Sequence, residues 1–159
     1  MNNLISLDSY RPVELPVSKQ EKQKYSIKYY ERLNIYKTSN VEFDPETEIA
    51  TSYGWWIFVK RINKQLVFNN YQYSSSTSKH QCKVSLLIDQ LGIKIDLFIE
   101  CPQGLNNLDS SVAYYKSKIQ ELTDLINKKG TKKAKNTERK AEIKHLKAMI
   151  KTVTKLMKG

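Results

Sequence analysis

Cysteine is scarce in this chain. Its 159 residues include two cysteines, Cys82 and Cys101, and these do not form a CxxC pair. A disulfide framework or a structural zinc site requires more thiols at closer spacing. The sequence therefore predicts two reduced thiols in an intracellular, cytoplasmic protein, with no metal ion and no cofactor.

Long apolar runs are also absent. No stretch approaches the roughly 18 consecutive apolar residues that a membrane-spanning helix needs. The first residues, Met1 to Asp8, lack the basic segment and the apolar run of a secretory signal. At the same time 40% of the residues are hydrophobic and 10% are aromatic, which is typical of a folded domain. The sequence therefore predicts a folded protein without a membrane partner.

Catalytic motifs are missing as well. The chain has two histidines and contains no GxSxG, P-loop, HExxH or DxD pattern, so we expect a protein that is not an enzyme. One alternative is a magnesium-dependent nuclease centre, in which Asp96 and Glu100 on one strand face would act with His80. A thiol catalyst made of Cys101 with His80 or His145 rests on residue type alone.

Acidic residues are scarce in the C-terminal part of the chain. The whole chain carries a net charge of +11, and most of this charge lies in that part. Residues 1–115 contain 13 Lys and Arg against 12 Asp and Glu, whereas residues 116–159 contain 14 against 4. Clustered like charge is unfavourable unless it is solvated or matched by a partner. The C-terminal part therefore predicts an anionic partner, most simply nucleic acid. The alternative is a solvated face rich in lysine.

The N-terminal part gives weaker signals. Residues 1–18 contain two prolines and no periodicity, which predicts an extended arm. From Lys19 to Tyr36, residues at helical spacing predict an amphipathic helix, and they are Tyr25, Tyr29, Leu33 and Tyr36. Acidic residues around Pro45 then favour an edge strand or a loop, and residues 48–53 favour a short strand.

A β-hairpin is the clearest strand signal. Residues 55–62 and 65–73 are rich in aromatic and β-branched residues and flank Asn63-Lys64. A two-residue turn places Val59 opposite Phe68, Ile57 opposite Asn70 and Arg61 opposite Leu66. The predicted core face consists of Trp55, Ile57, Val59, Leu66 and Phe68. The other face consists of Trp56, Phe58, Lys60, Val67, Asn69, Tyr71 and Tyr73.

That second face is too aromatic for plain solvent surface. Trp56, Lys60 and Tyr71 could form a platform on which the bases of nucleic acid stack. The alternative is that a helix covers this face.

A helix follows the hairpin. Hydroxyl residues from Ser74 to Ser78 supply an N-cap, and the apolar stripe before Gly92 predicts a helix over residues 78–91. Lys79, His80 and Lys83 near its start could bind a phosphate. The alternative is an ordinary amphipathic helix. Alternation from Ile93 to Ile99 predicts a strand, and residues 103–109 predict a linker.

Two apolar runs with three-four spacing end the sequence, which indicates an antiparallel helical hairpin. The first run is Val112, Tyr115, Ile119, Leu122 and Ile126, and the second is Ile143, Leu146, Ile150, Val153 and Met157. The connection between them is basic and predicts phosphate contacts, at Lys128, Lys129, Lys132, Lys133, Lys135, Arg139 and Lys140. Gly130 is expected to end the first helix, and Asn136 or Thr137 to cap the second.

These signals together predict an α+β fold. A small antiparallel sheet with packed helices would form a core domain over residues 19–102, after the arm of residues 1–18. A linker of residues 103–109 would lead to a basic helical hairpin over residues 110–159. The expected function is that of a non-catalytic, phage-like accessory protein that binds DNA or RNA through phosphates. One alternative is a protein–protein module, such as an inhibitor, adaptor or assembly factor, that uses the helical hairpin and the N-terminal arm or forms a homo-oligomer through the hairpin. The other alternative is the metal-dependent nuclease.

Overall fold

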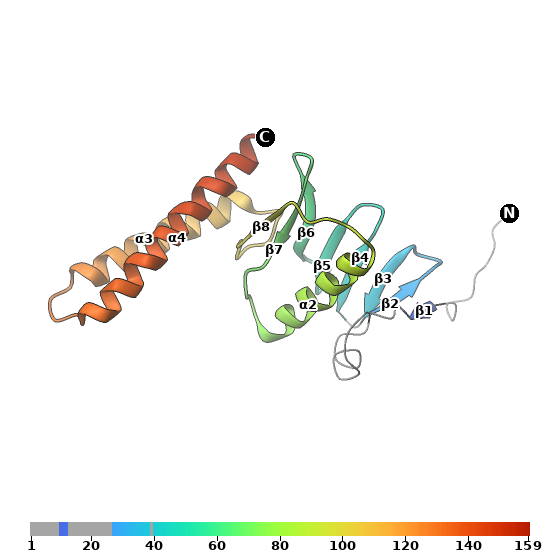
Figure 1. The fold of residues 1–159 in the computed structure, drawn as a ribbon, viewed down its shortest axis with the longest axis horizontal. Coiled ribbons are helices and arrows are strands. Elements are labelled where there is room, and N and C mark those ends of the chain that lie inside the picture. Colours follow the sequence, from blue (N-terminus) through green and yellow to red (C-terminus); the bar gives the residue numbers. More distant parts are fainter. Residues whose placement is uncertain (1–9, 13–26, 39) are drawn as a thin grey trace.

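A computed structural model describes residues 10–12, 27–38 and 40–159. In these residues a single mixed sheet has eight strands in sequence order. Helix α2 packs on one face of the sheet. The base of the α3–α4 hairpin packs on the other face, and the rest of the hairpin extends away from the sheet (Figure 1). The predicted α+β class is right, but the prediction of a small antiparallel sheet is wrong.

The strands are short and the helices lengthen along the chain. The strands are β1 (Tyr10–Pro12), β2 (Lys28–Tyr30), β3 (Ile35–Thr38), β4 (Val41–Asp44), β5 (Ile49–Ser52), β6 (Trp56–Ile62), β7 (Gln65–Asn69) and β8 (Leu97–Ile99). The helices are α2 (Ser75–Gln90), α3 (Leu108–Asn127) and α4 (Lys133–Lys158). All neighbouring strands are antiparallel except β7 and β8, which are parallel because α2 connects them as a crossover.

The helix predicted over residues 19–36 is wrong where the structure describes it, because residues 28–36 form β2, a turn and β3. Tyr29 pairs with Tyr36 across the two strands, and their ring centroids are 4.8 Å apart. Leu33, expected on the buried helix face, is 55% exposed in the turn. Tyrosine and isoleucine favour strands when they can pair with a neighbour, and this pairing outweighs the helical spacing. Residues 19–26 lie outside the described residues.

The sheet is larger than predicted because it also includes residues 41–44 as an inner strand and residues 10–12 as an added strand. Strand β4 lies between β3 and β5, so the prediction of an edge strand or loop is wrong for residues 41–44. Pro45 lies just beyond the strand, in a turn where Asp44 Oδ1 accepts the Glu46 N–H at 2.9 Å. The short strand predicted at residues 48–53 corresponds to β5. Within the predicted arm, residues 10–12 pair with β2, and the rest lies outside the described residues.

The predicted β6–β7 hairpin is confirmed. Asn63 and Lys64 have φ angles of 49° and 66°, as the two central residues of a type I′ turn require. Val59 pairs with Phe68 and Arg61 pairs with Leu66, as expected. The third predicted pair, Ile57 with Asn70, is not formed because β7 ends at Asn69.

The predicted faces of β6 are partly wrong because the strand contains a β-bulge. Ala50 of β5 pairs with Val59, while the next residue, Thr51, pairs with Ile57, which leaves Phe58 as an extra residue. Phe58 and Val59 are therefore both buried in the same cluster. Ahead of the bulge, Trp56 is buried at 1% exposure and Trp55 is 59% exposed, the reverse of the prediction.

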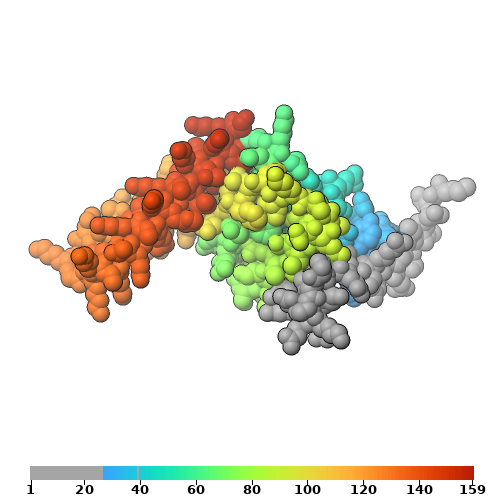
Figure 2. Space-filling view, viewed as in Figure 1, coloured from blue at the N-terminus to red at the C-terminus, as the bar shows by residue number. Residues whose placement is uncertain are grey.

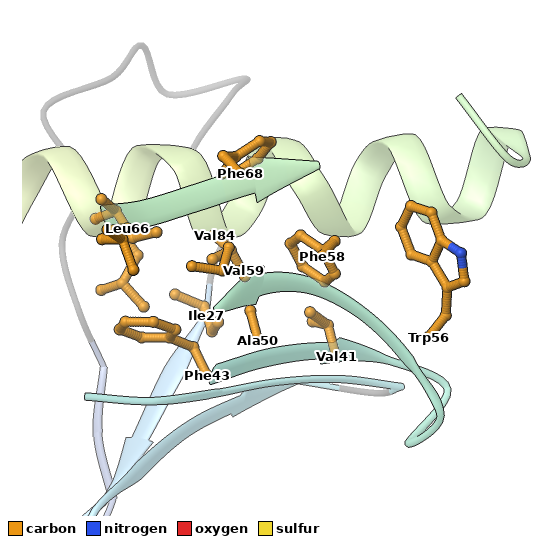
Figure 3. Close-up of a cluster of buried hydrophobic side chains, with 12 residues drawn as sticks. Ile27, Val41, Phe43, Ala50, Trp56, Phe58, Val59, Leu66, Phe68 and Val84 are labelled. Carbon is orange, nitrogen blue, oxygen red and sulfur yellow. The ribbon is translucent and has the colours of Figure 1, made fainter. Parts of the chain in front are cut away.

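The first hydrophobic cluster lies between the sheet and α2 (Figure 3). It includes Ile27, Val41, Phe43, Ala50, Trp56, Phe58, Val59, Leu66, Phe68, Val84, Leu87 and Ile88. Helix α2 starts three residues earlier than predicted, because Ser74 is the N-cap and its Oγ accepts the Thr77 N–H at 3.1 Å. It ends before Gly92, which has a φ of 70°.

The second cluster joins the opposite sheet face to the helical hairpin. Its buried members are Val67, Ile99, Cys101, Leu105, Val112, Tyr115, Leu122, Leu146, Val153 and Leu156. The strand expected from Ile93 is shorter, since β8 spans Leu97–Ile99. At the end of the seam, Leu156 is buried while Met157, predicted there, is 37% exposed. The hairpin and the sheet thus share one core, and the division into arm, core domain and hairpin stays a prediction.

Asn69 holds the chain between these two clusters, and its removal should be costly. Its side chain donates to the Cys101 carbonyl at 2.8 Å and accepts the Cys101 N–H at 2.9 Å. Replacing Asn69→Ala leaves two buried backbone groups without partners, so we expect the free energy of unfolding to fall by about 2–4 kcal/mol. Urea denaturation measures this change. Asn70→Ala, at an exposed neighbouring position, is the control, and equal losses in the two variants would contradict the assignment.

Candidate nucleic-acid interface

The helical hairpin stands out from the sheet, with its connecting loop at the far end (Figure 1). Figure 2 shows the same segment, coloured from orange to red, projecting from the body of the molecule. Its base is held to the sheet: His145 Nε2 lies 3.0 Å from Glu100 Oε2, and the Asn63 side chain donates to the Leu156 carbonyl. The hairpin is therefore a projecting, anchored element.

The seven basic residues predicted at the hairpin tip do gather there. Lys128, Lys129 and Lys132 lie in or beside the loop, and the other four lie in the first turns of α4. All are exposed except Arg139, which is half-buried and donates to Asn136 Oδ1 at 3.1 Å. The predicted caps at Asn136 or Thr137 are wrong, because α4 already begins at Lys133.

Sequence analysis missed a second basic feature on α4, a row of seven lysines that we call the lysine face. It consists of Lys133, Lys140, Lys144, Lys147, Lys151, Lys155 and Lys158. At 3.6 residues per turn, these seven positions fall within about 80° of one another around the helix axis. All seven are exposed. The sequence signal for this face is the spacing of its lysines, which from Lys140 onward recur every three or four residues.

The lysine face lies opposite the packed side of α4. Leu146, Val153 and Leu156 are buried against α3 and the sheet. The acidic residues of α4, Glu138 and Glu142, fall on the packed half by the same helical count. The ammonium groups of the seven lysines form no ion pair or hydrogen bond with another described residue. Their charges are therefore not neutralised within the part of the chain that the structure describes.

One end of the lysine face borders a cleft of about 420 Å³. Lys151 and Lys155 line it on one side, and Asn63 and Gln65 of the β6–β7 hairpin line it on the other. The cleft combines two cationic groups with two amides, which are donors that suit an oxyanion.

The three residues predicted as a base-stacking platform do not share an open face. Trp56 is buried and its Nε1 donates to the Pro102 carbonyl at 3.2 Å. Tyr71 is half-buried, with its ring 6.5 Å from that of Tyr114, and burial raises the pKa of its hydroxyl. Lys60 is half-buried and donates to Asn106 Oδ1 at 3.0 Å. The predicted platform at these positions is wrong, because Trp56 is packed into the cluster beneath α2 and Tyr71 is packed beside Tyr114 of α3.

The residues predicted to bind phosphate at the start of α2 are also separated. Lys79 is exposed, but His80 points inward, with its Nδ1 2.7 Å from Ser52 Oγ and 6% of its surface exposed. Burial lowers the pKa of His80, with a smaller effect from Lys83, so the neutral imidazole is favoured. Burial, together with the nearby charge of Lys79, lowers the pKa of Lys83 as well. Among these three, Lys79 is the one placed to meet an anion.

The carboxylates of the nuclease alternative face different partners. Asp96 Oδ2 accepts the Leu66 N–H at 2.8 Å, whereas Glu100 contacts His145. In the described part of the chain no three His, Cys, Asp or Glu side chains come together as metal ligands. Cys101 is fully buried, and burial raises the pKa of its thiol to about 11, which disfavours the nucleophilic thiolate.

Comparison of the chain with protein-family models, curated proteins and solved structures finds no match. None of the helices in the described residues combines the length and the apolar character needed to cross a membrane.

The buried His80 should make folding sensitive to acid. Its folded pKa lies below the value near 6.5 of an unfolded histidine, so the unfolded chain binds more protons between these two values. The stability from neutral His80 is thus present above about pH 6.5 and is lost as the pH falls toward the folded pKa. In urea denaturation between pH 7.5 and pH 5, we expect a smaller loss of stability for His80→Gln than for the unaltered chain. Identical pH profiles would contradict this.

Proposed function

We propose that this protein is a non-catalytic accessory protein that binds nucleic acid through the phosphate backbone. The observation that carries the proposal is the lysine face, a row of seven exposed lysines along a helix whose other side is packed in the core. The tip residues extend this surface around the end of the hairpin. Two free thiols fit a place of action in the cytoplasm.

The dimensions of the lysine face suit a regularly charged polymer. From Lys133 to Lys158 the helix rises about 38 Å, close to one turn of a nucleic-acid duplex at about 34 Å. Lysines repeat every three or four residues, so cationic groups recur about every 4.5–6 Å along this length, apart from one wider gap of seven residues. A strand of phosphates can follow such a stripe, and each contact releases counterions.

The chemistry of the lysine face favours contacts with phosphates over recognition of particular bases. Lysine is a point charge, whereas bidentate recognition of a base edge is the role of arginine. The face contains no arginine, and Arg139 at the tip is partly engaged with Asn136. We therefore propose binding that is independent of sequence. Phosphates are common to DNA and RNA, and the proposal covers both.

The protein–protein alternative draws less support from the same helices. The apolar seam on which it depended packs within the chain, because Leu122, Leu146 and Val153 are buried between α3, α4 and the sheet. In the described part of the hairpin this seam is therefore not available to a partner helix.

The salt dependence of binding tests the proposal. We would compare the unaltered chain with a face variant (Lys144, Lys147 and Lys151→Gln) and a tip variant (Lys129, Lys132 and Lys135→Gln). If three phosphate contacts are lost, the slope of log affinity against log salt should fall by about 2–3 units in each variant. Fluorescence anisotropy of a labelled oligonucleotide measures this slope.

A matched control removes the same charge elsewhere. Changing Lys64, Lys94 and Lys116→Gln alters three exposed lysines outside the lysine face and the tip. If net charge alone drives binding, the control and the face variant will lose slope equally, and the proposed surface is wrong. No salt-dependent binding by the unaltered chain would contradict the function itself.

A further inference from the structure

Three large aromatic side chains stay exposed at one corner of the sheet. Tyr53 and Trp55 lie in the β5–β6 turn, and Tyr73 immediately precedes the N-cap of α2. Their exposed fractions are 46%, 59% and 53%. The rings of Trp55 and Tyr73 meet edge to face with centroids 6.0 Å apart. We call these three residues the aromatic corner.

Packing within the described residues does not explain these side chains. Trp56, the next residue, fills the core, while Trp55 turns most of its surface to solvent. Tyr53 has a φ of 55°, in the left-handed region that favours glycine or asparagine over a bulky side chain. Its ring lies 5.2 Å from that of His80, and nearly half of the residue remains exposed. An aromatic residue held in an unfavourable conformation and left exposed points to a role in recognition.

The surroundings of the aromatic corner favour an anionic ligand. The first turn of α2, directly after Tyr73, contains no acidic residue, and Lys79 in the same helix is exposed. A partner that presents flat rings together with negative charge would match both features. The unpaired bases of a single-stranded nucleic acid have this chemistry, since bases stack on aromatic rings and phosphates pair with cations.

We propose that the aromatic corner stacks unpaired bases, so that the protein binds single-stranded nucleic acid, or a single-stranded segment beside a duplex, more tightly than duplex alone. This inference rests on the proposed function. In Figure 1 the N-terminal end of α2 lies on the side of the molecule toward which the hairpin projects. The lysine face then supplies the electrostatic part of the binding free energy, and the aromatic corner discriminates between paired and unpaired bases.

Intrinsic fluorescence and affinity together test the inference on the full chain. The probes are an oligothymidine of about 15 nucleotides and a duplex of the same length. Stacking on Trp55 should quench its emission when the oligothymidine binds. The signal should vanish in Trp55→Phe, which keeps Trp56, because that ring is buried. Trp55→Ala should weaken oligothymidine binding by roughly 5- to 100-fold and leave duplex affinity unchanged.

Leu33→Ala is the matched control. Leu33 is an apolar residue with a similar exposed fraction, 55%. It lies in the β2–β3 turn, away from the β5–β6 turn that contains Trp55. Its replacement should leave both affinities unchanged, and thermal unfolding should show that all variants are folded. If Trp55→Ala behaves like Leu33→Ala, or weakens duplex binding as much as single-strand binding, the inference is overturned and the lysine face still stands.

Two other outcomes assign the aromatic corner differently. Quenching by vesicles of phosphatidylcholine and phosphatidylserine, without quenching by oligothymidine, would assign it to a lipid surface and overturn the inference. Failure of the unaltered chain to bind either nucleic acid would overturn both the inference and the proposed function.

Discussion

The structure depends on one strand that is buried on both of its faces. Four consecutive residues of β7, Leu66 to Asn69, are buried. Leu66 and Phe68 point into the cluster beneath α2, and Val67 points into the cluster beneath the helical hairpin. Strand β7 also pairs with β6 on one side and β8 on the other. Strand β7 therefore contributes side chains to both hydrophobic clusters, one beneath α2 and one beneath the base of the helical hairpin.

A polar network holds this doubly buried strand in register. The Asn69 side chain satisfies the backbone of Cys101, and Gln81 of α2 donates to the Asn69 carbonyl at 2.6 Å. Buried backbone groups without hydrogen-bond partners cost free energy. The side-chain amides of Asn69 and Gln81 supply these partners, and they therefore fix the positions at which β7 and β8 end. The same contacts set the starting point of the hairpin, since α3 begins seven residues after Cys101. The position of the basic surface therefore follows from contacts in the core.

The two candidate surfaces have different physical origins. The lysine face follows from the amphipathic pattern of α4: once Leu146 and Val153 are packed, the lysines opposite them must face solvent. The aromatic corner follows from the irregularity of the sheet. The bulge at Phe58 changes the alternation along β6, so Trp56 enters the core and Trp55 is left in the exposed turn. A regular strand would have placed Trp55 on the core face and Trp56 on the opposite face.

The sequence by itself determined the features that depend on residues close together in the chain. The β6–β7 turn, the cap of α2, the pairing of α3 with α4 and the basic hairpin tip all follow from local conformational preference or from a short repeat. The tertiary structure decided what depends on distant partners. Tyr29 and Tyr36 have helical spacing and nevertheless pair across two strands, because β4 and the rest of the sheet offer them a neighbour. Likewise Trp56, Lys60 and Tyr71 could be grouped on one face only if β6 were regular and uncovered. A bulge and two layers of helices exclude that arrangement, and both arise from contacts that no local pattern records.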